Sequence, residues 1–344
     1  MTTLNLEERI NDFAVLGEWL EKKSTQDLLA ANAYLANPWF TTENVGMAIQ
    51  AIIPWLKQEK LQKWISPYHL DEFTPKTIGV VMAGNIPLAG FHDYLSVLIT
   101  GNKLKAKLSS QDYVLLKSIT DYLISINHYW SQQIELAEQI KGVDAVIATG
   151  SNNTSRYFEY YFRNVPLLLR RNRTSAAALS GHESDNELSG LAEDILSYFG
   201  LGCRNVSMIF LPEKTTLDVI TRALFSRSNI LEHHKYANSY TYQRALLLMD
   251  QQPFTDTGFC ILRESQIPSS PVGVIHFQRY SEETQIQDWL EKNKDQIQCL
   301  VSRDFSGSVP FGKAQHPELT DYADNIDTIQ FIGEVGSQRT NTFS

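Results

Sequence analysis

The chain has 344 residues, 43% of them hydrophobic and 20% charged, a composition typical of a globular protein with a large core and roughly two domains. Its 30 basic and 39 acidic residues give a formal net charge of −9, which argues against non-specific nucleic-acid binding. The 3 cysteines indicate a reduced compartment rather than a disulfide framework. The N-terminus has no signal-peptide pattern, and no apolar run reaches the ~20 residues that span a bilayer. We therefore expect a soluble, cytoplasmic protein without a membrane span.

The first 75 residues carry helical patterns. Apolar side chains recur at helical spacing from Leu6 to Leu16 and again from Val45 to Leu56, and Asn37-Pro38 interrupts the pattern between them. No cluster of chemically reactive residues accompanies these patterns. We predict an N-terminal helical segment over residues 1–75 that packs on the cofactor domain.

From residue 76 onward, short apolar runs alternate with helical patterns. They predict strands at 77–82, 103–108 and 143–148 and helices at 88–100, 112–130 and 154–162. This alternation implies right-handed βαβ units and a parallel sheet, which we assign to a nucleotide-binding domain over residues 76–170. Ligands on such sheets bind beyond the carboxyl ends of the strands. The residues that follow these ends are polar, small or basic, as a nucleotide site requires: Gly84-Asn85, Lys107-Leu-Ser-Ser110 and Thr149-Gly-Ser151.

A second α/β pattern occupies residues 171–310 and predicts a catalytic domain. Helical patterns cover 187–198 and 285–297, and strand-like runs lie at 206–211, 258–262, 272–277 and 298–302. Residues 311–344 form a loop-rich return segment and tail. The sequence thus predicts an α/β fold with two Rossmann-like domains, parallel-rich sheets and an N-terminal helical segment.

One cysteine of the second domain is a candidate nucleophile. Gly200-Leu-Gly202 delivers Cys203 from the end of a helical pattern to the start of a strand. Glycines beside a cysteine let backbone and substrate approach closely, and a thiolate is a strong nucleophile. The alternative is a buried structural cysteine, which sequence alone favours.

Six stretches, taken in their order along the chain, point to a family. They are Gly84-Asn85-Ile-Pro87-Leu88, Gly101-Asn102 with Lys107-Leu-Ser-Ser, Thr149-Gly-Ser151 with Arg156, Gly200 to Cys203, Ile261-Leu-Arg-Glu264, and Pro310-Phe-Gly-Lys-Ala. Together they resemble the aldehyde dehydrogenase superfamily over most of residues 76–332. Each motif alone is weak, and their order is what carries the resemblance.

The resemblance implies a role for each candidate residue. Cys203 corresponds to the catalytic cysteine, and the Asn85 amide would help to form the oxyanion hole. The implied cofactor-binding residues are Lys107, Ser109, Ser110, Gly150, Ser151 and Glu264. Among these, Lys107 would contact the ribose and phosphate, Gly150 and Ser151 the pyrophosphate, and Glu264 the nicotinamide ribose.

Within the superfamily, the compact length, the small-residue approach to Cys203 and the segment Gly312–Thr328 resemble the LuxC-type acyl-CoA reductases. Hydrolytic members carry a general-base glutamate in a region that matches Leu167–Arg173 here, and this region contains no acid. A reductase does not need that base, because hydride rather than water resolves the acyl-enzyme. The resemblance therefore implies reduction of a long-chain acyl-CoA thioester to an aldehyde, with coenzyme A as part of the substrate.

Single residues bear on the choice of cofactor and on whether each candidate residue has a role other than binding or catalysis. Ser110 stands where NAD-preferring relatives often have a glutamate that would repel a 2′-phosphate, so NADPH is expected rather than NADH. Without a ligand, Asn85 could be a turn residue, Lys107 a solvated charge, and Gly150 and Ser151 a helix start. The competing functions are an aldehyde or semialdehyde dehydrogenase, an acyl-phosphate-linked dehydrogenase, and an inactive scaffold with the same fold.

The remaining polar clusters are less informative. His233-His234 lacks the partner spacing of a metal site, so no metal is expected. Cys260 and Cys299 lie in apolar strand patterns and are expected in the core. Arg170, Arg171 and Arg173 either bind a phosphate of coenzyme A or pair with part of the excess acid. Homo-oligomer formation and an acyl-activating partner protein remain open by family analogy.

Overall fold

The computed structural model describes residues 4–70 and 74–337, so the ends of the predicted N-terminal and C-terminal segments, and residues 71–73, lie outside the described residues. The chain divides into two compact units. The first contains the described residues up to Asn172 and those from Glu318 onward, and the second runs from Arg173 to Pro317. No helix among the described residues combines the length and the apolar character that crossing a membrane requires.

The first unit begins with helices, as the sequence predicts. They are α1 (Leu6–Glu21), α2 (Lys23–Ala36), α3 (Thr42–Ile52), the short 3₁₀ helix η1 (Ile53–Leu56) and α4 (Gln58–Ile65). A capping box between Asn5 and Glu8 starts α1, and the Thr41 hydroxyl caps α3 by accepting a hydrogen bond from the Asn44 N–H. Helix α2 ends before Asn37-Pro38, where proline disfavours helix for the residue before it.

The first sheet has five parallel strands in the order β3-β2-β1-β4-β5. Its strands are β1 (Thr77–Val81), β2 (Lys103–Lys107), β3 (Ile134–Leu136), β4 (Ala145–Thr149) and β5 (Leu167–Arg170), and the connecting helices are α5 (Phe91–Ile99), α6 (Tyr113–Ile126), α7 (Trp130–Gln133) and α8 (Asn152–Tyr161). The strand order reverses between β1 and β4, so their carboxyl ends flank the topological switch point. The sequence did not predict β3 or β5, and the predicted helix 112–130 is divided into α6 and α7.

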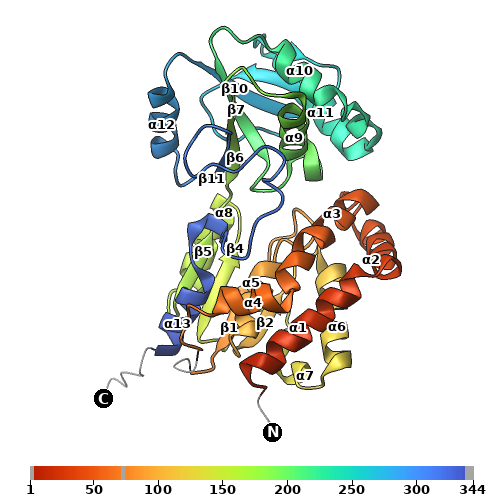
Figure 1. Cartoon of the computed structure of the whole chain (residues 1–344), viewed down its shortest axis with the longest axis vertical. Helices are drawn as coiled ribbons and strands as arrows, with labels where there is room; N and C mark the ends of the chain where they lie inside the picture. The colour runs from red at the N-terminus through yellow and green to blue at the C-terminus, as the bar shows by residue number, and fades with distance from the viewer. Residues whose placement is uncertain (1–3, 71–73, 338–344) are drawn as a thin grey trace. The chain divides into compact units, whose positions relative to one another are not determined.

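The C-terminal segment returns to this unit. The short helix η5 (Ala323–Asn325) precedes α13 (Thr328–Ser337), which packs against α5 and is drawn in blue in Figure 1. The Arg170 guanidinium, at the end of β5, is buried and donates to the Ala323 carbonyl, to Asp93 at 2.7 Å and to the Thr328 hydroxyl at 2.7 Å. The expectation of a loop-rich tail is therefore wrong for residues 328–337, because β5 and α5 offer this helix a buried partner.

The second sheet has six strands in the order β11-β6-β7-β10-β9-β8, all parallel except for the antiparallel pair β8-β9. Its strands are β6 (Thr174–Ala178), β7 (Val206–Pro212), β8 (Thr255–Asp256), β9 (Ile261–Glu264), β10 (Val274–Tyr280) and β11 (Ile297–Val301). The helices are α9 (Asp185–Leu196), α10 (Asp218–Phe225), α11 (His234–Met249) and α12 (Glu283–Lys292), with the short 3₁₀ helices η3 (Ser197–Gly200) and η4 (Ser228–Glu232).

Two hydrophobic clusters cover the two faces of this sheet. Alternation along β6 sends Ala177 and Leu179 into a cluster with α9 and α10, and Ala176 and Ala178 into a cluster with Trp289 of α12. A parallel sheet covered on both faces is the arrangement that buries such strands completely. The predicted fold class, two α/β domains with parallel-rich sheets, is confirmed.

Candidate active site

The chain approaches Cys203 through a strained turn. Tyr198 and Phe199 have positive φ angles of 50° and 59°, and Gly200 follows with 76°. Non-glycine residues in this region cost roughly 1–2 kcal/mol each, and such strain persists only where the surroundings enforce it. Both aromatic side chains are buried, and the Phe199 ring packs 4.3 Å from the His233 ring. The turn therefore delivers Cys203 in a defined position after helix α9.

Asn205 holds this turn from inside. Its Nδ2 donates to the carbonyl oxygens of Asp194 at 3.1 Å, Ile195 at 3.3 Å and Ser197 at 2.8 Å, and its Oδ1 accepts from the Gly202 N–H at 2.8 Å. The side chain is buried, so these contacts are shielded from water. One amide thus joins the end of α9 to the residue before Cys203.

Cys203 itself is half-exposed and lies just before the amino end of β7. The Ser175 hydroxyl, on the neighbouring strand β6, donates to the Cys203 carbonyl at 3.1 Å. Arg204 is fixed as well, because its Nε donates to the Ala314 carbonyl at 2.5 Å. The backbone on both sides of the cysteine is therefore anchored, and the residue remains partly exposed.

The predicted closing stretch 310–314 is anchored to the same helix. Asp194 of α9 accepts hydrogen bonds from the Gly312 N–H at 2.7 Å and the Ala314 N–H at 3.0 Å. Burial raises the pKa of Asp194 to about 7, against the lowering effect of these two hydrogen bonds. Gly190 lets the segments approach, since a Cβ there would lie 2.7 Å from the Gly312 nitrogen.

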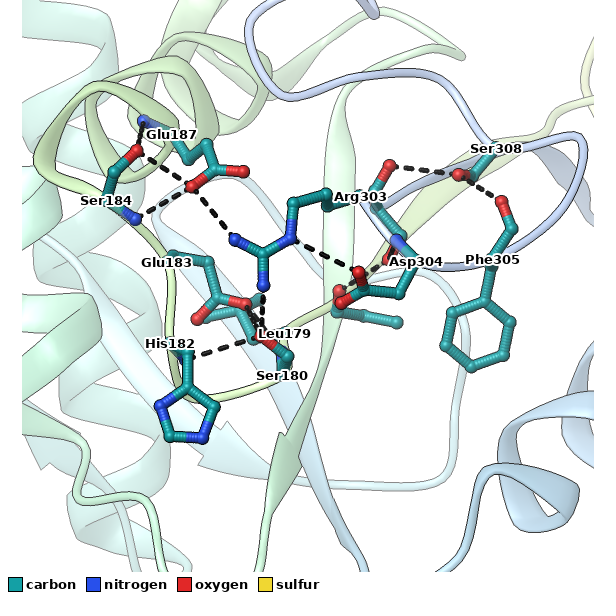
Figure 2. Close-up of polar contacts among 12 residues, drawn as sticks. Leu179, Ser180, His182, Glu183, Ser184, Glu187, Arg303, Asp304, Phe305 and Ser308 are labelled. Carbon is teal, nitrogen blue, oxygen red and sulfur yellow. Dashed lines mark hydrogen bonds and ion pairs between the residues drawn. The ribbon is translucent and has the colours of Figure 1, made fainter.

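The opposite edge of the second sheet carries a closed polar network, which Figure 2 shows. At the carboxyl ends of β6 and β11, the Arg303 guanidinium contacts Asp304 at 3.2 Å, Ser180 at 3.2 Å and Glu187 at 3.5 Å. Glu187 also completes the capping box of α9 with Ser184. Because these side chains pair with one another and cap α9, this edge of the sheet stabilises the start of a helix and is not a reactive site.

Asn85 is exposed on the loop that follows β1 of the first unit. The loop is fixed at Leu88, whose φ is 59° and whose N–H donates to the buried Asp112 carboxyl at 2.7 Å. Burial raises the pKa of Asp112 well above its ordinary value, and its Oδ1 has no hydrogen-bond partner. Gly84 packs against Ser109, because a Cβ at Gly84 would lie 2.3 Å from the Ser109 hydroxyl oxygen. The predicted residues 84, 85 and 109 are thus neighbours.

Lys107, also predicted, borders a pocket in the first unit. Its Nζ donates to the Glu138 carbonyl at 2.7 Å. The pocket has a volume of about 680 Å³ and is lined by Val81 and Lys107, by residues 138–143, and by Phe158, Tyr161, Phe162, Asn164 and Val165. The sequence did not indicate residues 138–143 or the aromatic side chains of α8 as part of a site. If β3 had been predicted, residues 138–143, which follow it, would have been placed at the same edge of the sheet as Lys107.

Gly150 and Ser151 lie at the start of α8, next to this pocket. Ser151 caps the helix by accepting a hydrogen bond from the Thr154 N–H at 3.2 Å. A Cβ at Gly150 would lie 2.8 Å from the Phe158 ring, which itself lines the pocket. Ser110 is exposed after β2, and its neighbour Ser109 faces Gly84 as described. The residues of α8 that line the pocket, Phe158 and Tyr161, lie in the second half of the helix, so Gly150 and Ser151 are not part of the lining.

The remaining candidates take different places. Glu264 is exposed at the end of β9. His233 caps α11 by accepting from the Tyr236 N–H, and among the described residues no group of His, Cys, Asp and Glu side chains is placed to hold a metal ion. Cys260 is buried as expected, and Cys299 on β11 is half-buried and packs against the hydrophobic cluster on one face of the second sheet.

The three arginines of the basic stretch are held by protein groups. Arg170 pairs with Asp93 as described, Arg171 pairs with Glu159 at 3.0 Å, and Arg173 donates to the carbonyl oxygens of Lys294 and Ile297. For Arg170 and Arg171 the structure bears out the reading in which they pair with acidic residues.

Comparison with known proteins finds likeness in structure but not in sequence. No protein-family model matches the chain, and no curated protein matches it. An indole-3-acetaldehyde dehydrogenase in complex with NAD⁺ is similar with a TM-score of 0.66 and 13% identity, covering 90% of this chain and 74% of that one. An NAD-dependent aldehyde dehydrogenase from Sinorhizobium meliloti has a TM-score of 0.65 and 9% identity, covering 92% and 72%. An NAD⁺ complex of aldehyde dehydrogenase from Bacillus cereus has a TM-score of 0.62 and 12% identity, covering 87% and 72%. The chain has an aldehyde-dehydrogenase-like fold.

Proposed function

We propose that this chain reduces a long-chain acyl-CoA thioester to the aldehyde, with NADPH as hydride donor and a covalent acyl-Cys203 intermediate. The observation that carries the proposal is the strained turn from Tyr198 to Gly200, which presents a half-exposed cysteine on an anchored backbone. Strain of this kind is concentrated at functional sites. The fold supports a nicotinamide-linked reaction, since solved structures that share it include NAD⁺ complexes.

The proposed chemistry starts at the Cys203 thiolate. It attacks the carbonyl carbon of the acyl thioester, and coenzyme A leaves as the tetrahedral oxyanion collapses to an acyl-Cys203 thioester. The family resemblance assigns stabilisation of the oxyanion to the Asn85 amide and the Cys203 backbone N–H. NADPH, when bound, supplies the hydride that brings the acyl group to the aldehyde level. Release of the aldehyde returns Cys203 as the thiolate.

The pocket beside α8 fits the nucleotide half of such a cofactor. A volume of about 680 Å³ is within the range of small-molecule sites, and the rings of Phe158 and Phe162 offer an apolar surface for a base. The Lys107 ammonium group and the start of α8 at Ser151 are suited to phosphate groups. Because Ser110 carries a neutral hydroxyl rather than a carboxylate, it would not repel the 2′-phosphate of NADPH. This favours NADPH over NADH.

Reduction is favoured over hydrolytic oxidation by β5. The segment Leu167–Arg173 contains no acid that could activate water, and Arg170 on this strand is committed to Asp93. An acyl-Cys203 intermediate would therefore persist long enough to accept hydride. A dehydrogenase that passes the acyl group to phosphate also lacks a hydrolytic base, and it is the second candidate function.

The test is the oxidation of NADPH upon addition of long-chain acyl-CoA, followed by absorbance. Three proteins are compared: the native chain, Cys203→Ala and, as a matched control, Cys260→Ala. We expect acyl-CoA-dependent oxidation in the native chain and in Cys260→Ala, and none in Cys203→Ala. A Cys203-dependent reaction with acyl phosphate but not with acyl-CoA would replace the proposal by the second candidate.

Two results would reject the mechanism. Activity that survives in Cys203→Ala excludes the covalent intermediate. No activity with either NADPH or NADH across acyl chain lengths, together with no shift of the melting temperature by either nucleotide, supports an inactive scaffold.

A further inference from the structure

One buried hydroxyl of the second unit contacts two cysteines, Cys203 through its backbone carbonyl and Cys299 through its sulfur. Ser175 lies on β6, between β7 and β11, and its side chain is fully buried. Its Oγ is 3.1 Å from the Cys203 carbonyl oxygen and 3.1 Å from the Cys299 Sγ. Two such contacts in series leave the Cys299 sulfur at most about 6 Å from the Cys203 carbonyl oxygen. The second thiol therefore belongs to the surroundings of the candidate nucleophile.

The hydrogen-bond directions define the resting state of Cys299. A serine hydroxyl has a single proton, and Ser175 donates it to the Cys203 carbonyl. The contact between Ser175 and Cys299 must then use the thiol S–H as donor and the hydroxyl oxygen as acceptor. In this arrangement the Cys299 S–H points to the Ser175 oxygen.

The pairing of β11 around Cys299 is irregular, whereas the backbone of Cys203 is anchored. Cys299 lies between Ile297 and Leu300, where the pairing of β11 with β6 shifts register. Cys203 lies in the turn before β7 rather than within a strand. Bulges of this kind re-aim side chains without breaking the rest of a sheet. The two sulfurs can therefore meet through local movement of β11.

Cys260, the third cysteine, has a different environment. It is completely buried and its sulfur lies 3.2 Å from the Thr257 hydroxyl, just before β9. In the sheet, β7 and β10 separate β9 from β6. Cys260 is therefore neither accessible nor close to Ser175.

We propose that Cys203 and Cys299 form an intramolecular disulfide when the nucleophile is oxidised by a hydroperoxide. The Cys203 thiolate attacks the peroxide oxygen, which breaks the O–O bond and gives a sulfenic acid and hydroxide. The Cys299 sulfur then attacks the sulfenic sulfur and forms the S–S bond, while its proton and the sulfenic hydroxyl leave as water. Overall, one thiolate and one thiol are oxidised to the disulfide, and hydrogen peroxide is reduced to one hydroxide ion and one water. Cys299 thereby protects the nucleophile from irreversible oxidation, because a dithiol reductant restores both thiols.

The sequence allows a direct test by mass spectrometry on the full chain. Trypsin separates the three cysteines into peptides 174–204, 245–263 and 295–303, which contain Cys203, Cys260 and Cys299, respectively. The reduced protein is treated with equimolar hydrogen peroxide and digested without reductant. We expect peptides 174–204 and 295–303 to be joined with the loss of two hydrogens, and dithiothreitol to restore both free peptides.

Variants at the two other cysteines give the matched comparison. In Cys299→Ser the disulfide is absent, and Cys203 advances to the sulfinic acid, which dithiothreitol does not reverse. Cys260→Ser behaves as the native chain does. If Cys299→Ser does not fold, the peptide map of the native chain decides the matter alone.

Three results would overturn the proposal. They are a native chain in which Cys203 reaches the sulfinic acid as fast as in Cys299→Ser, a disulfide that joins Cys203 to Cys260, and a disulfide that joins the Cys203 residues of two molecules. The readout requires no substrate, so a failed reductase assay does not affect it, and a failed disulfide test does not affect the proposed reduction.

Discussion

Replacement of Asn205 by alanine should destabilise the second unit and displace the candidate nucleophile. The side chain donates to three carbonyl oxygens at the end of α9 and accepts from the Gly202 N–H, all in a buried position. Alanine removes these contacts and leaves the buried Gly202 N–H without its acceptor. The first consequence is therefore a loss of stability, and the second is a looser turn around Cys203.

The magnitude follows from the groups left behind. A buried donor without an acceptor costs about 1–3 kcal/mol, and carbonyl oxygens that lose one donor cost less because they have two lone pairs. We expect a decrease of about 3 kcal/mol in the free energy of unfolding of the second unit. Displacement of a reacting atom by about 1 Å typically lowers a rate by about 10²-fold, and we expect a loss of this order in Cys203-dependent turnover.

Hydrogen exchange measured by mass spectrometry can report the second unit separately, through peptides that cover α9 and β7. The matched control is Asn186→Ala, which changes an exposed asparagine on the same helix α9 and should stay within about 0.5 kcal/mol of the native chain. If Asn205→Ala exchanges like this control and keeps the native turnover, the side chain does not organise the turn, and the argument for a built nucleophile site fails.

Three further predictions address packing, pH and thiol reactivity. Gly190→Ala should destabilise the protein by about 1–2 kcal/mol in urea unfolding, because its Cβ would lie 2.7 Å from the Gly312 nitrogen. The control Gly46→Ala, at a helical position with no atom within 4 Å of the added Cβ, should stabilise it by up to about 1 kcal/mol. Equal effects of the two substitutions would refute the close approach at Gly190. Because burial raises the pKa of Asp194 from 3.8 to about 7, the folded state binds a proton that the unfolded state releases, so stability should decrease between about pH 4 and pH 7 by ~4 kcal/mol at most, and this slope should be reduced in Asp194→Asn. Burial also raises the pKa of Cys260 to about 11, so iodoacetamide should alkylate the other two cysteines first, and early labelling of peptide 245–263 would contradict its buried position.

The sequence predicted the order of elements well, because strand–helix alternation is a local signal. It missed four strands, β3, β5, β6 and the two-residue β8, and for β3 and β6 the reason is physical. The strand β3, Ile134–Leu136, is only three residues long and has no apolar run, and β6, Thr174–Ala178, consists of threonine, serine and alanine, residues with mixed or weak preference for strands. β6 is a strand because it pairs with β7 and β11 on its two sides, and the five residues of β6 alone do not reveal these partners.

The candidate site divides in the same way. Sequence indicated Cys203, Asn85 and Lys107 because glycine-rich turns and strand ends are recognisable patterns. It did not indicate Asp112 or Asn205, whose importance lies in hydrogen bonds to backbone groups that only the fold brings near. Buried polar residues of this kind look like ordinary helix or turn residues in a sequence.

The edge on which each candidate lies follows from the direction of the chain. In the first unit, Asn85, Lys107 and Ser151 follow strands, so they lie at the carboxyl edge, where ligands of parallel sheets usually bind. Cys203 instead follows helix α9, which runs back across the second sheet, and therefore lies at the amino edge of β7.

This difference explains why a rule about strand ends does not find the candidate nucleophile. At the carboxyl edge of the second sheet, Arg303 pairs with both Glu187 and Asp304, and Glu187 also completes the capping box that starts helix α9 (Figure 2). At the amino edge, the chain is instead strained at Tyr198 and Phe199 and tied down by Asn205. Strain that the fold must offset is evidence of function, whereas self-satisfied charges are evidence of stability. The chemistry of the second unit is therefore to be sought at the amino edge of β7.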